Sequence, residues 1–206
     1  RRSVESGDYT MSQLIFKFPF KIKYYEQDFY VSSNNFSAYK LIEDWPNWSG
    51  KWLNVFGSSG SGKTHLSKIL EKKIDKLQVV DAKLINNKII DELNNLDCLI
   101  IDNYQNNIDE KLFYSILNQS KQLENYILIN SIPSLREFSL KLADLQSRIN
   151  SFVFIGIELP TDDLLKVIIS KTLSDKQISL DPKISQFIIK NVERSYEKMF
   201  KKLAHT

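Results

Sequence analysis

The chain has 206 residues, enough for one α/β domain and a small second lobe. Hydrophobic residues make up 42% of it, charged residues 26%, and the formal net charge is +3, so a polyanionic partner is neither required nor excluded. No apolar run is long enough to span a bilayer, and the N-terminus lacks a secretory signal pattern. The single cysteine, Cys98, excludes an internal disulfide and fits a reducing compartment. We therefore expect a cytoplasmic protein without a membrane partner.

The predicted elements start with an extended arm at residues 14–20, where Pro19 argues against a central strand. Residues 33–42 have helical spacing. Beyond them, short apolar runs alternate with helical periods. We expect strands at 51–56, 77–81, 98–101, 126–129 and 152–157, and helices at 64–77, 84–93, 108–121 and 135–149. This alternation predicts an α/β fold with a parallel sheet and right-handed crossovers.

After Pro160 the strand pattern stops. Thr161 is a candidate N-cap, and the acidic Asp162 and Asp163 suit the first turn of a helix. Residues 181–182, Asp followed by Pro, repeat this start signal. We therefore divide the chain into an arm (1–23), an α/β domain (24–160) and a helical lobe (161–206).

One short segment holds half of the six glycines of the chain. It follows an expected strand, precedes an expected helix and matches G-x-x-x-x-G-K-[ST], the pattern of a phosphate-binding loop. Glycines let backbone N–H groups converge on a polyphosphate, and the helix N-terminus adds partial positive charge. A flexible linker is the alternative, but linkers seldom end in Lys-Thr at a helix start. The expected nucleotide-binding residues are Gly57, Ser58, Ser59, Gly60, Ser61, Gly62, Lys63 and Thr64, with His65 next to them.

The motif assigns chemistry to individual side chains. Lys63 is expected to reach the β- and γ-phosphates, and the Thr64 hydroxyl to bind Mg²⁺. Asp102 ends the apolar run 98–101 and is the matching acidic residue that holds the Mg²⁺ shell. Without the phosphate loop nearby, Asp102 would be interpreted as an ordinary turn-forming aspartate at the end of a strand. The expected cofactors are ADP or ATP with Mg²⁺.

Position 103 decides how reactive such a site is. Many ATPases place a second carboxylate after the acidic residue to orient the attacking water, and this chain has Asn103. An amide can hydrogen-bond water but cannot take its proton, and general-base help contributes about 10²–10⁴ in rate. We therefore expect slow or negligible intrinsic ATP hydrolysis.

With these residues in place, the chain resembles the DnaA-like group of AAA+ proteins, and most closely their DnaA-homologous regulators. Four stretches carry the likeness: residues 28–31 followed by two Asn, DWPNW at 44–48, LIIDN at 99–103, and LADLQSR at 142–148. The resemblance implies an AAA+ P-loop core with a small helical lid, here shorter than in relatives and so expected to be truncated. It implies that Phe29, Tyr30 and Val31 lie beside the adenine.

The resemblance also implies two arginines and a sensor. Arg148 corresponds to the arginine finger that acts on nucleotide bound by a neighbouring molecule; a solvated arginine at a helix end is the alternative. Arg194 corresponds to the second sensor of the lid, with a surface salt bridge as the alternative. The first sensor is expected at Asn130 or Ser131, although the usual motif after it is reduced here.

The N-terminal arm resembles the peptide with which such regulators bind the sliding clamp of the replisome. Gln13 would fix register, and Leu14, Phe16 and Phe18 would enter apolar pockets. An arm packed on its own domain is the alternative.

Three functions are compatible with these features. The first is a regulator of chromosome replication initiation, tethered to the clamp, that promotes inactivation of initiator-bound ATP. The second is a free-standing AAA+ ATPase such as a helicase loader, and the third a small-molecule kinase, which the lack of an arginine-rich lid disfavours. No sequence-specific DNA binding is expected, because the helical lobe takes up the residues after Pro160. Self-association stays open.

Overall fold

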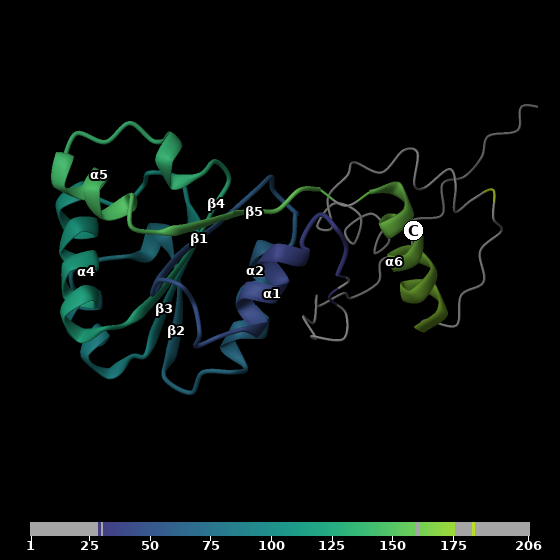
Figure 1. Cartoon of the computed structure of the whole chain (residues 1–206), viewed down its shortest axis with the longest axis horizontal. Coiled ribbons are helices and arrows are strands. Elements are labelled where there is room, and N and C mark those ends of the chain that lie inside the picture. Colours follow the sequence, from purple (N-terminus) through teal and green to yellow (C-terminus); the bar gives the residue numbers. More distant parts are fainter. Residues whose placement is uncertain (1–28, 30, 160, 176–182, 184–206) are drawn as a thin grey trace, which may run out of the picture.

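A parallel sheet between two layers of helices forms the centre of the computed structural model, which describes residues 29, 31–159, 161–175 and 183 (Figure 1). The strands are β1 (Trp52–Phe56), β2 (Leu77–Asp81), β3 (Cys98–Tyr104), β4 (Tyr126–Ser131) and β5 (Val153–Gly156). They lie in the order β2-β3-β4-β1-β5, and each neighbouring pair is parallel. The predicted α/β fold is confirmed.

The helices connect these strands and cover both faces of the sheet. They are α1 (Phe36–Glu43), α2 (Lys63–Glu71), α3 (Lys88–Glu92), α4 (Glu110–Leu123), α5 (Ala143–Ile149) and α6 (Asp162–Asp175), with short 3₁₀ turns η2 (Ala82–Leu84), η3 (Leu93–Asn95) and η4 (Leu135–Glu137). In Figure 1, α1 and α2 lie on one side of the sheet and α4 and α5 on the other.

Alternating side chains of the central strands fill two separate cores. Leu99 and Ile101 of β3 belong to the core under α3, α4 and α5, whereas Cys98 and Ile100 belong to the core under α1 and α2. All four are 0% exposed. A strand covered on both faces must be apolar at every position, and this explains the continuous apolar run in the sequence.

The strand order determines which side chains meet at the carboxyl edge of the sheet. β4 lies between β1 and β3, and Val55 of β1 is in register with Asn130 of β4. On the other side of β3, Asp81 of β2 is in register with Asp102. Ligand sites of open parallel sheets form outside the carboxyl ends of strands. This order therefore gathers the end of β1, Asn130 and Asp102 at one site.

The helix predicted at 64–77 is wrong in its second half. Helix α2 ends at Glu71, and a turn leads into β2, which begins at Leu77 as predicted. Ile74 is 5% exposed within this turn, so it continues the apolar spacing of the helix without being helical. The periodic spacing of apolar residues reflects which positions are buried, and here buried positions continue beyond the end of the helix.

The continuous helices predicted at 84–93 and 135–149 are also wrong. The first is broken into η2, α3 and η3, and the second into η4 and α5. In the second, a capping box of Ser134 and Glu137 starts η4, and Phe138 is extended with its ring 5.3 Å from that of Tyr104. Packing of this aromatic pair competes with the local helical preference and takes precedence.

The start of the helix after Pro160 agrees with the sequence prediction. The backbone N–H of Leu164 donates to Oγ1 of Thr161 at 3.4 Å, and α6 begins at Asp162. This helix lies beyond α1 and α2, away from α4 and α5 (Figure 1). The start signal at 181–182 and the arm at 14–20 lie outside the described residues. Among the described helices, none has the length and apolar character needed to cross a bilayer.

Cys98 offers a chemical probe of this fold. Burial, with a contribution from the charge of Asp97, raises the pKa of its thiol to about 12. At pH 8 such a thiol is ionised about 10³-fold less than one with a pKa near 9, and the thiolate is the reactive form. We expect iodoacetamide to modify the native protein at least that much more slowly than the urea-unfolded chain, measured by mass spectrometry. Equal rates would show that β3 is not buried in the folded protein.

Candidate nucleotide-binding site

The glycine loop joins the end of β1 to the start of α2. Its first residue is anchored: the N–H of Gly57 donates to the carbonyl oxygens of Ser131 and Ile132 at 3.2 and 3.1 Å. Gly60 and Gly62 have φ values of 75° and 106°, which side chains rarely tolerate. In the described structure the N–H groups of Gly60, Gly62 and Lys63 donate no backbone hydrogen bond. The loop therefore presents donors at the N-terminus of a helix.

Lys63 lies folded onto this loop. Its Nζ donates to the carbonyl oxygens of Gly57 and Ser58 at 2.6 and 2.9 Å. Burial lowers the pKa of the ammonium group below its ordinary value, and the charge of Asp102 partly opposes this effect. A phosphate would supply the close negative partner that the half-buried ammonium group lacks among the described residues.

The carboxylate of Asp102 receives three donors. Oγ1 of Thr64 donates to Oδ2 at 3.0 Å, and Oδ1 accepts from Nδ2 of Asn130 and from the N–H of Asn103, each at 3.0 Å. Asp102 is 9% exposed, so these bonds replace most of its hydration. The predicted metal pair Thr64 and Asp102 is thus brought together from α2 and β3.

Of the two sensor candidates, Asn130 is the one that adjoins Asp102. Its Nδ2 also donates to Oγ of Ser67 on α2 at 2.8 Å. Ser131 instead donates to the carbonyl oxygen of Pro133 and accepts from Asn54, at 2.6 and 3.0 Å. Asn130 therefore links the loop helix, the acidic strand and β4, a contact that the sequence left open.

The residues of the site fit a nucleoside phosphate with Mg²⁺. Hydroxyl and carboxylate oxygens, as in Thr64 and Asp102, are the ligands that Mg²⁺ prefers. Two buried polar atoms without a hydrogen-bond partner in the described structure, Ser61 Oγ and Asn130 Oδ1, belong to this region. Buried polar atoms of this kind usually have a partner. When bound, the metal ion neutralises charge on the phosphates.

An aromatic cluster borders the helix that follows the loop. The ring of Phe29 stacks on Tyr39 of α1 at 5.6 Å and meets His65 edge-on at 5.1 Å. Val31 is 43% exposed, and Tyr30 lies outside the described residues. Tyr39 was not predicted, because its helical spacing alone gave no sign that it would meet the residues expected beside the adenine.

Asn103 is engaged by a residue that the sequence analysis missed. Its Nδ2 donates to Oδ2 of Asp81, the last residue of β2, at 2.8 Å. The signal was available, since Asp81 ends an expected strand in the same way as Asp102. What the sequence did not give was the neighbour relation between β2 and β3.

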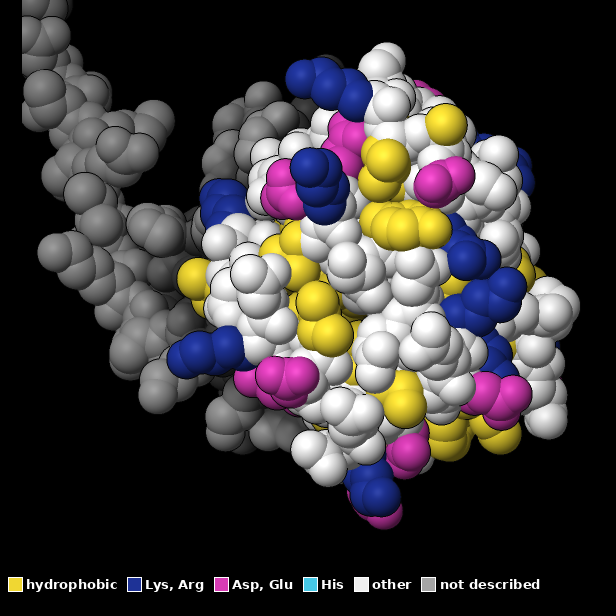
Figure 2. Space-filling model, turned by 90° about the vertical axis from the view of Figure 1, so that its left-hand side faces the viewer, with side chains coloured by type: hydrophobic (Ala, Val, Ile, Leu, Met, Phe, Trp, Pro, Cys, Tyr) yellow, Lys and Arg dark blue, Asp and Glu magenta, His cyan; other side chains and the backbone are white. Residues whose placement is uncertain are grey.

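Of the remaining predicted site residues, the structure describes only Arg148. Arg148, in the last turn of α5, is half-buried, and its Nε donates to Oδ1 of Asn118 on α4 at 2.9 Å. It is therefore not a fully solvated arginine. Seen from the α4 and α5 side, basic and acidic side chains are mixed among apolar ones (Figure 2). The residues outside the described part are Arg194, Gln13, Leu14, Phe16 and Phe18.

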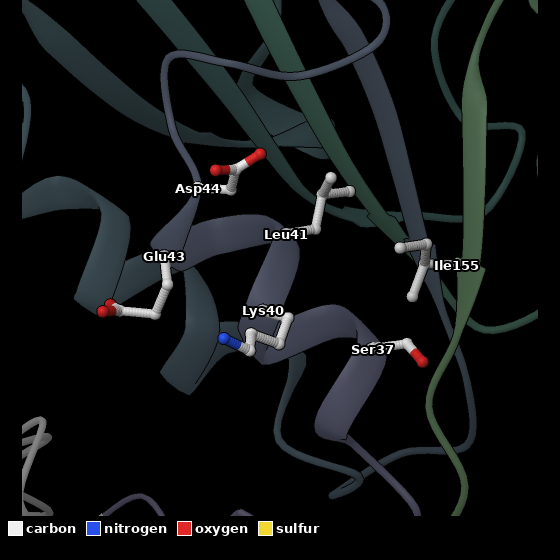
Figure 3. Close-up of a pocket in the computed structure, with 6 residues that line it drawn as sticks. All are labelled: Ser37, Lys40, Leu41, Glu43, Asp44 and Ile155. Carbon is white, nitrogen blue, oxygen red and sulfur yellow. The ribbon is translucent and has the colours of Figure 1, made fainter.

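A hollow of about 540 Å³ lies between α1 and the edge strand β5 (Figure 3). None of the predicted site residues lines it, and its walls carry charges of both signs. They are formed by Ser37, Lys40, Leu41, Glu43, Asp44 and Ile155. The nucleotide-binding features gather at the loop instead.

The strand order, the loop after β1 and the acidic end of β3 together define the AAA+ type of P-loop NTPase fold. No protein-family model matches the chain. The chain is 28% identical over 163 residues to the chromosomal replication initiator protein DnaA of Chlorobaculum tepidum, an alignment that covers 68% of this chain. It spans 33% of that protein, about a third of its length.

Solved structures agree on the fold. Domain III of the Thermotoga maritima replication initiation protein DnaA matches with a TM-score of 0.72 at 20% identity, covering 90% of this chain and 88% of that one. AMPPCP-bound DnaA from Aquifex aeolicus matches with a TM-score of 0.71 at 21% identity, covering 91% of this chain and 65% of that one. The chain therefore has the fold of a DnaA-like AAA+ domain.

The close approach at Gly57 gives a test of the loop. A Cβ there would lie 2.2 Å from the carbonyl oxygen of Ile157, whereas a Cβ at Gly50 would meet only Cγ2 of Val153 at 3.5 Å. We expect Gly57→Ala to lower the free energy of unfolding by about 1–3 kcal/mol, the usual effect of overpacking, and to weaken nucleotide binding. Gly50→Ala is the matched control. Urea unfolding and calorimetric titration measure both effects, and identical behaviour of the two variants would contradict the clash.

Proposed function

We propose that this protein binds ADP or ATP with Mg²⁺ and acts as a DnaA-related regulator of chromosome replication initiation. The observation that carries the proposal is the loop at Gly57–Thr64, with Lys63 behind it and Thr64 bonded to Asp102 at 3.0 Å. Its free N–H groups, ammonium group and oxygen ligands match the parts of a nucleoside di- or triphosphate with its metal ion.

An adenine base is supported by two observations. The Aquifex aeolicus DnaA that shares this fold is bound to AMPPCP, an adenine nucleotide analogue. In this chain, Phe29, Tyr39 and His65 form an aromatic group beside the first turn of α2, suited to a flat base. Val31 and Tyr30 belong to the same proposed adenine side.

The proposed role is regulation rather than vigorous intrinsic hydrolysis. Asn103 stands where a second carboxylate would orient and deprotonate water, and its amide is bonded to Asp81. The chemistry then takes place on a partner: Arg148 is proposed to act in trans on ATP held by the replication initiator, as in the DnaA-homologous regulator Hda. The bond from Nε of Arg148 to Asn118 leaves the terminal nitrogens of the guanidinium group for that task.

The N-terminal arm and the helical lobe complete the proposal. The arm with Gln13, Leu14, Phe16 and Phe18 is proposed to bind the sliding clamp. The lobe from 161 to 206 is proposed to be the lid, with Arg194 as its sensor. A free-standing ATPase such as a helicase loader would instead hydrolyse ATP rapidly by itself, with stimulation by DNA.

Nucleotide binding is tested with Lys63→Ala. Hydrogen bonds to charged groups contribute about 1.5–3 kcal/mol, so we expect affinity for Mg-ADP and Mg-ATP to fall by about 10- to 150-fold. Lys68→Ala is the matched control, because Lys68 pairs with Glu71 at 2.7 Å on the same helix. Calorimetric titration measures the affinities. Unchanged binding by Lys63→Ala, or no binding by the unaltered chain, would overturn the proposed function.

The regulatory role is tested by turnover of initiator-bound ATP in the presence of clamp loaded on DNA. Arginine fingers contribute about 10³–10⁵ in rate, so we expect Arg148→Ala to reduce the stimulation at least about 10²-fold. Arg136→Ala is the control, since that arginine stacks on Phe154 from an exposed turn. Gln13→Ala, or leaving out the clamp, should lower stimulation as well. Full activity of Arg148→Ala removes this residue from the mechanism.

A further inference from the structure

Three polar side chains meet at the carboxyl edge of β2 and β3. Asp81 ends β2 and is in register with Asp102 of β3, so the two carboxylates sit on neighbouring strands at the same height. Asn103 follows Asp102 directly. Asp102 belongs to the phosphate site described above, whereas neither the motif nor the family resemblance gave Asp81 a role.

The backbone turns Asn103 toward β2. Its φ is 58°, a left-handed conformation that asparagine tolerates better than most residues, and the register of β3 with β4 shifts between Ile101 and Tyr104. Its N–H donates to Oδ1 of Asp102 at 3.0 Å, and its Nδ2 donates to Oδ2 of Asp81 at 2.8 Å. One asparagine thus bridges two carboxylates.

Asp81 is held as a charged acceptor. Its Oδ1 accepts the N–H of Lys83 at 2.9 Å while Oδ2 accepts from Asn103. The hydrogen bond from Asn103, and then that from the Lys83 backbone, lower the pKa of the Asp81 carboxyl group. At neutral pH, position 103 therefore faces a fixed negative charge.

We propose that Asp81 is a positioning residue that reserves position 103 for an amide donor and so keeps the nucleotide site without a general base. This inference rests on the proposed nucleotide-binding function. With Asn103 in place, one N–H of its amide is committed to Asp81. The second N–H can still donate to water, and the amide oxygen is the one acceptor of this side chain. That oxygen can accept a hydrogen bond but cannot hold the proton.

A carboxylate at position 103 would meet the opposite situation. It has no N–H to offer Asp81, and two carboxylates at hydrogen-bond distance cannot both stay ionised. If it stays ionised it must turn away from β2, and the backbone loses the bond to Asp81. If it takes up a proton, its O–H can donate to Asp81, but the group can no longer act as a base. A simple exchange of Asn103 for aspartate is thus insufficient to create a base.

The competing explanation is that Asp81 serves only as the cap of the 3₁₀ turn η2. Asparagine caps about as well as aspartate, so Asp81→Asn keeps the cap and removes the charge. In the double variant Asp81→Asn/Asn103→Asp the pair is reversed, and the amide at position 81 can donate to the carboxylate at position 103. These exchanges change charge with almost no change in shape.

The test compares the full chain with Asn103→Asp, Asp81→Asn and the double variant. A fourth protein, Asp109→Asn/Asn103→Asp, is the matched control, because Asp109 is also a cap and accepts instead from Lys111 and Leu112 of α4. We expect Asn103→Asp to lower the urea midpoint, and the reversed pair to restore most of that loss. The Asp109 combination should restore none of it.

Single-turnover ATP cleavage gives the second measurement. We expect the unaltered chain and Asn103→Asp to stay at background, and the reversed pair to cleave at least about 10²-fold faster, the lower end of the range of about 10²–10⁴ that a general base provides. Additive urea midpoints, equal cleavage by Asn103→Asp alone, or no gain in the reversed pair would each overturn the proposal.

Calorimetric titration with Mg-ATP separates this inference from the function on which it rests. If none of the proteins, including the unaltered chain, binds ATP, the proposed function fails while the urea midpoints still decide whether Asp81 and Asn103 are coupled. If all of them bind ATP, the midpoints and the cleavage rates together decide the inference.

Discussion

The structure of the site depends on one buried carboxylate. Asp102 accepts hydrogen bonds from Thr64 of the loop helix, from Asn130 of β4 and from the backbone of Asn103, each at 3.0 Å. Thr64 and Asn130 come from segments distant in sequence from Asp102, so this single acceptor fixes their positions relative to β3. In water each donor would be satisfied separately. Inside the fold, the low exposure of Asp102 makes the set mutually dependent.

The parallel sheet makes this convergence available. All neighbouring strands run the same way, so the loops that follow the strands all leave at the same edge, while apolar side chains fill the cores above and below. A loop rich in left-handed glycine conformations would be unstable as an independent segment. Here it is held at one end by the bonds from Gly57 to Ser131 and Ile132, at the end of β4. At the other end it is held by α2, whose Leu66, Ile69 and Leu70 are buried. Rigid packing beneath the loop thus supports its exposed donors.

The same edge shows how binding and chemistry can be separated within one fold. Lysine, threonine and aspartate at the phosphate side suit a nucleotide. The adjoining Asn103, bonded to Asp81, offers water only an amide group, which cannot take its proton. Arg148 lies on α5, on the opposite face of the sheet from α2, and is oriented by Asn118. A domain of this design is suited to holding a nucleotide in its own site and presenting a cation to another molecule. This division is what the proposed regulatory role requires.

The sequence by itself determined the α/β class, all five strands, the phosphate loop and the residues Thr64 and Asp102. These features follow from local chemistry: continuous apolar runs for strands buried on both faces, and glycines where backbone donors must be bare. It did not determine where α2 ends, because Ile74 stays buried in the turn that follows. Nor did it place Phe138, whose contact with Tyr104 interrupts a helical pattern. Only the tertiary structure placed Asn130, rather than Ser131, against Asp102 and joined Asp81 to Asn103. The physical reason is that both contacts depend on which strands are neighbours and in what register they pair. The local sequence around each residue does not contain this information.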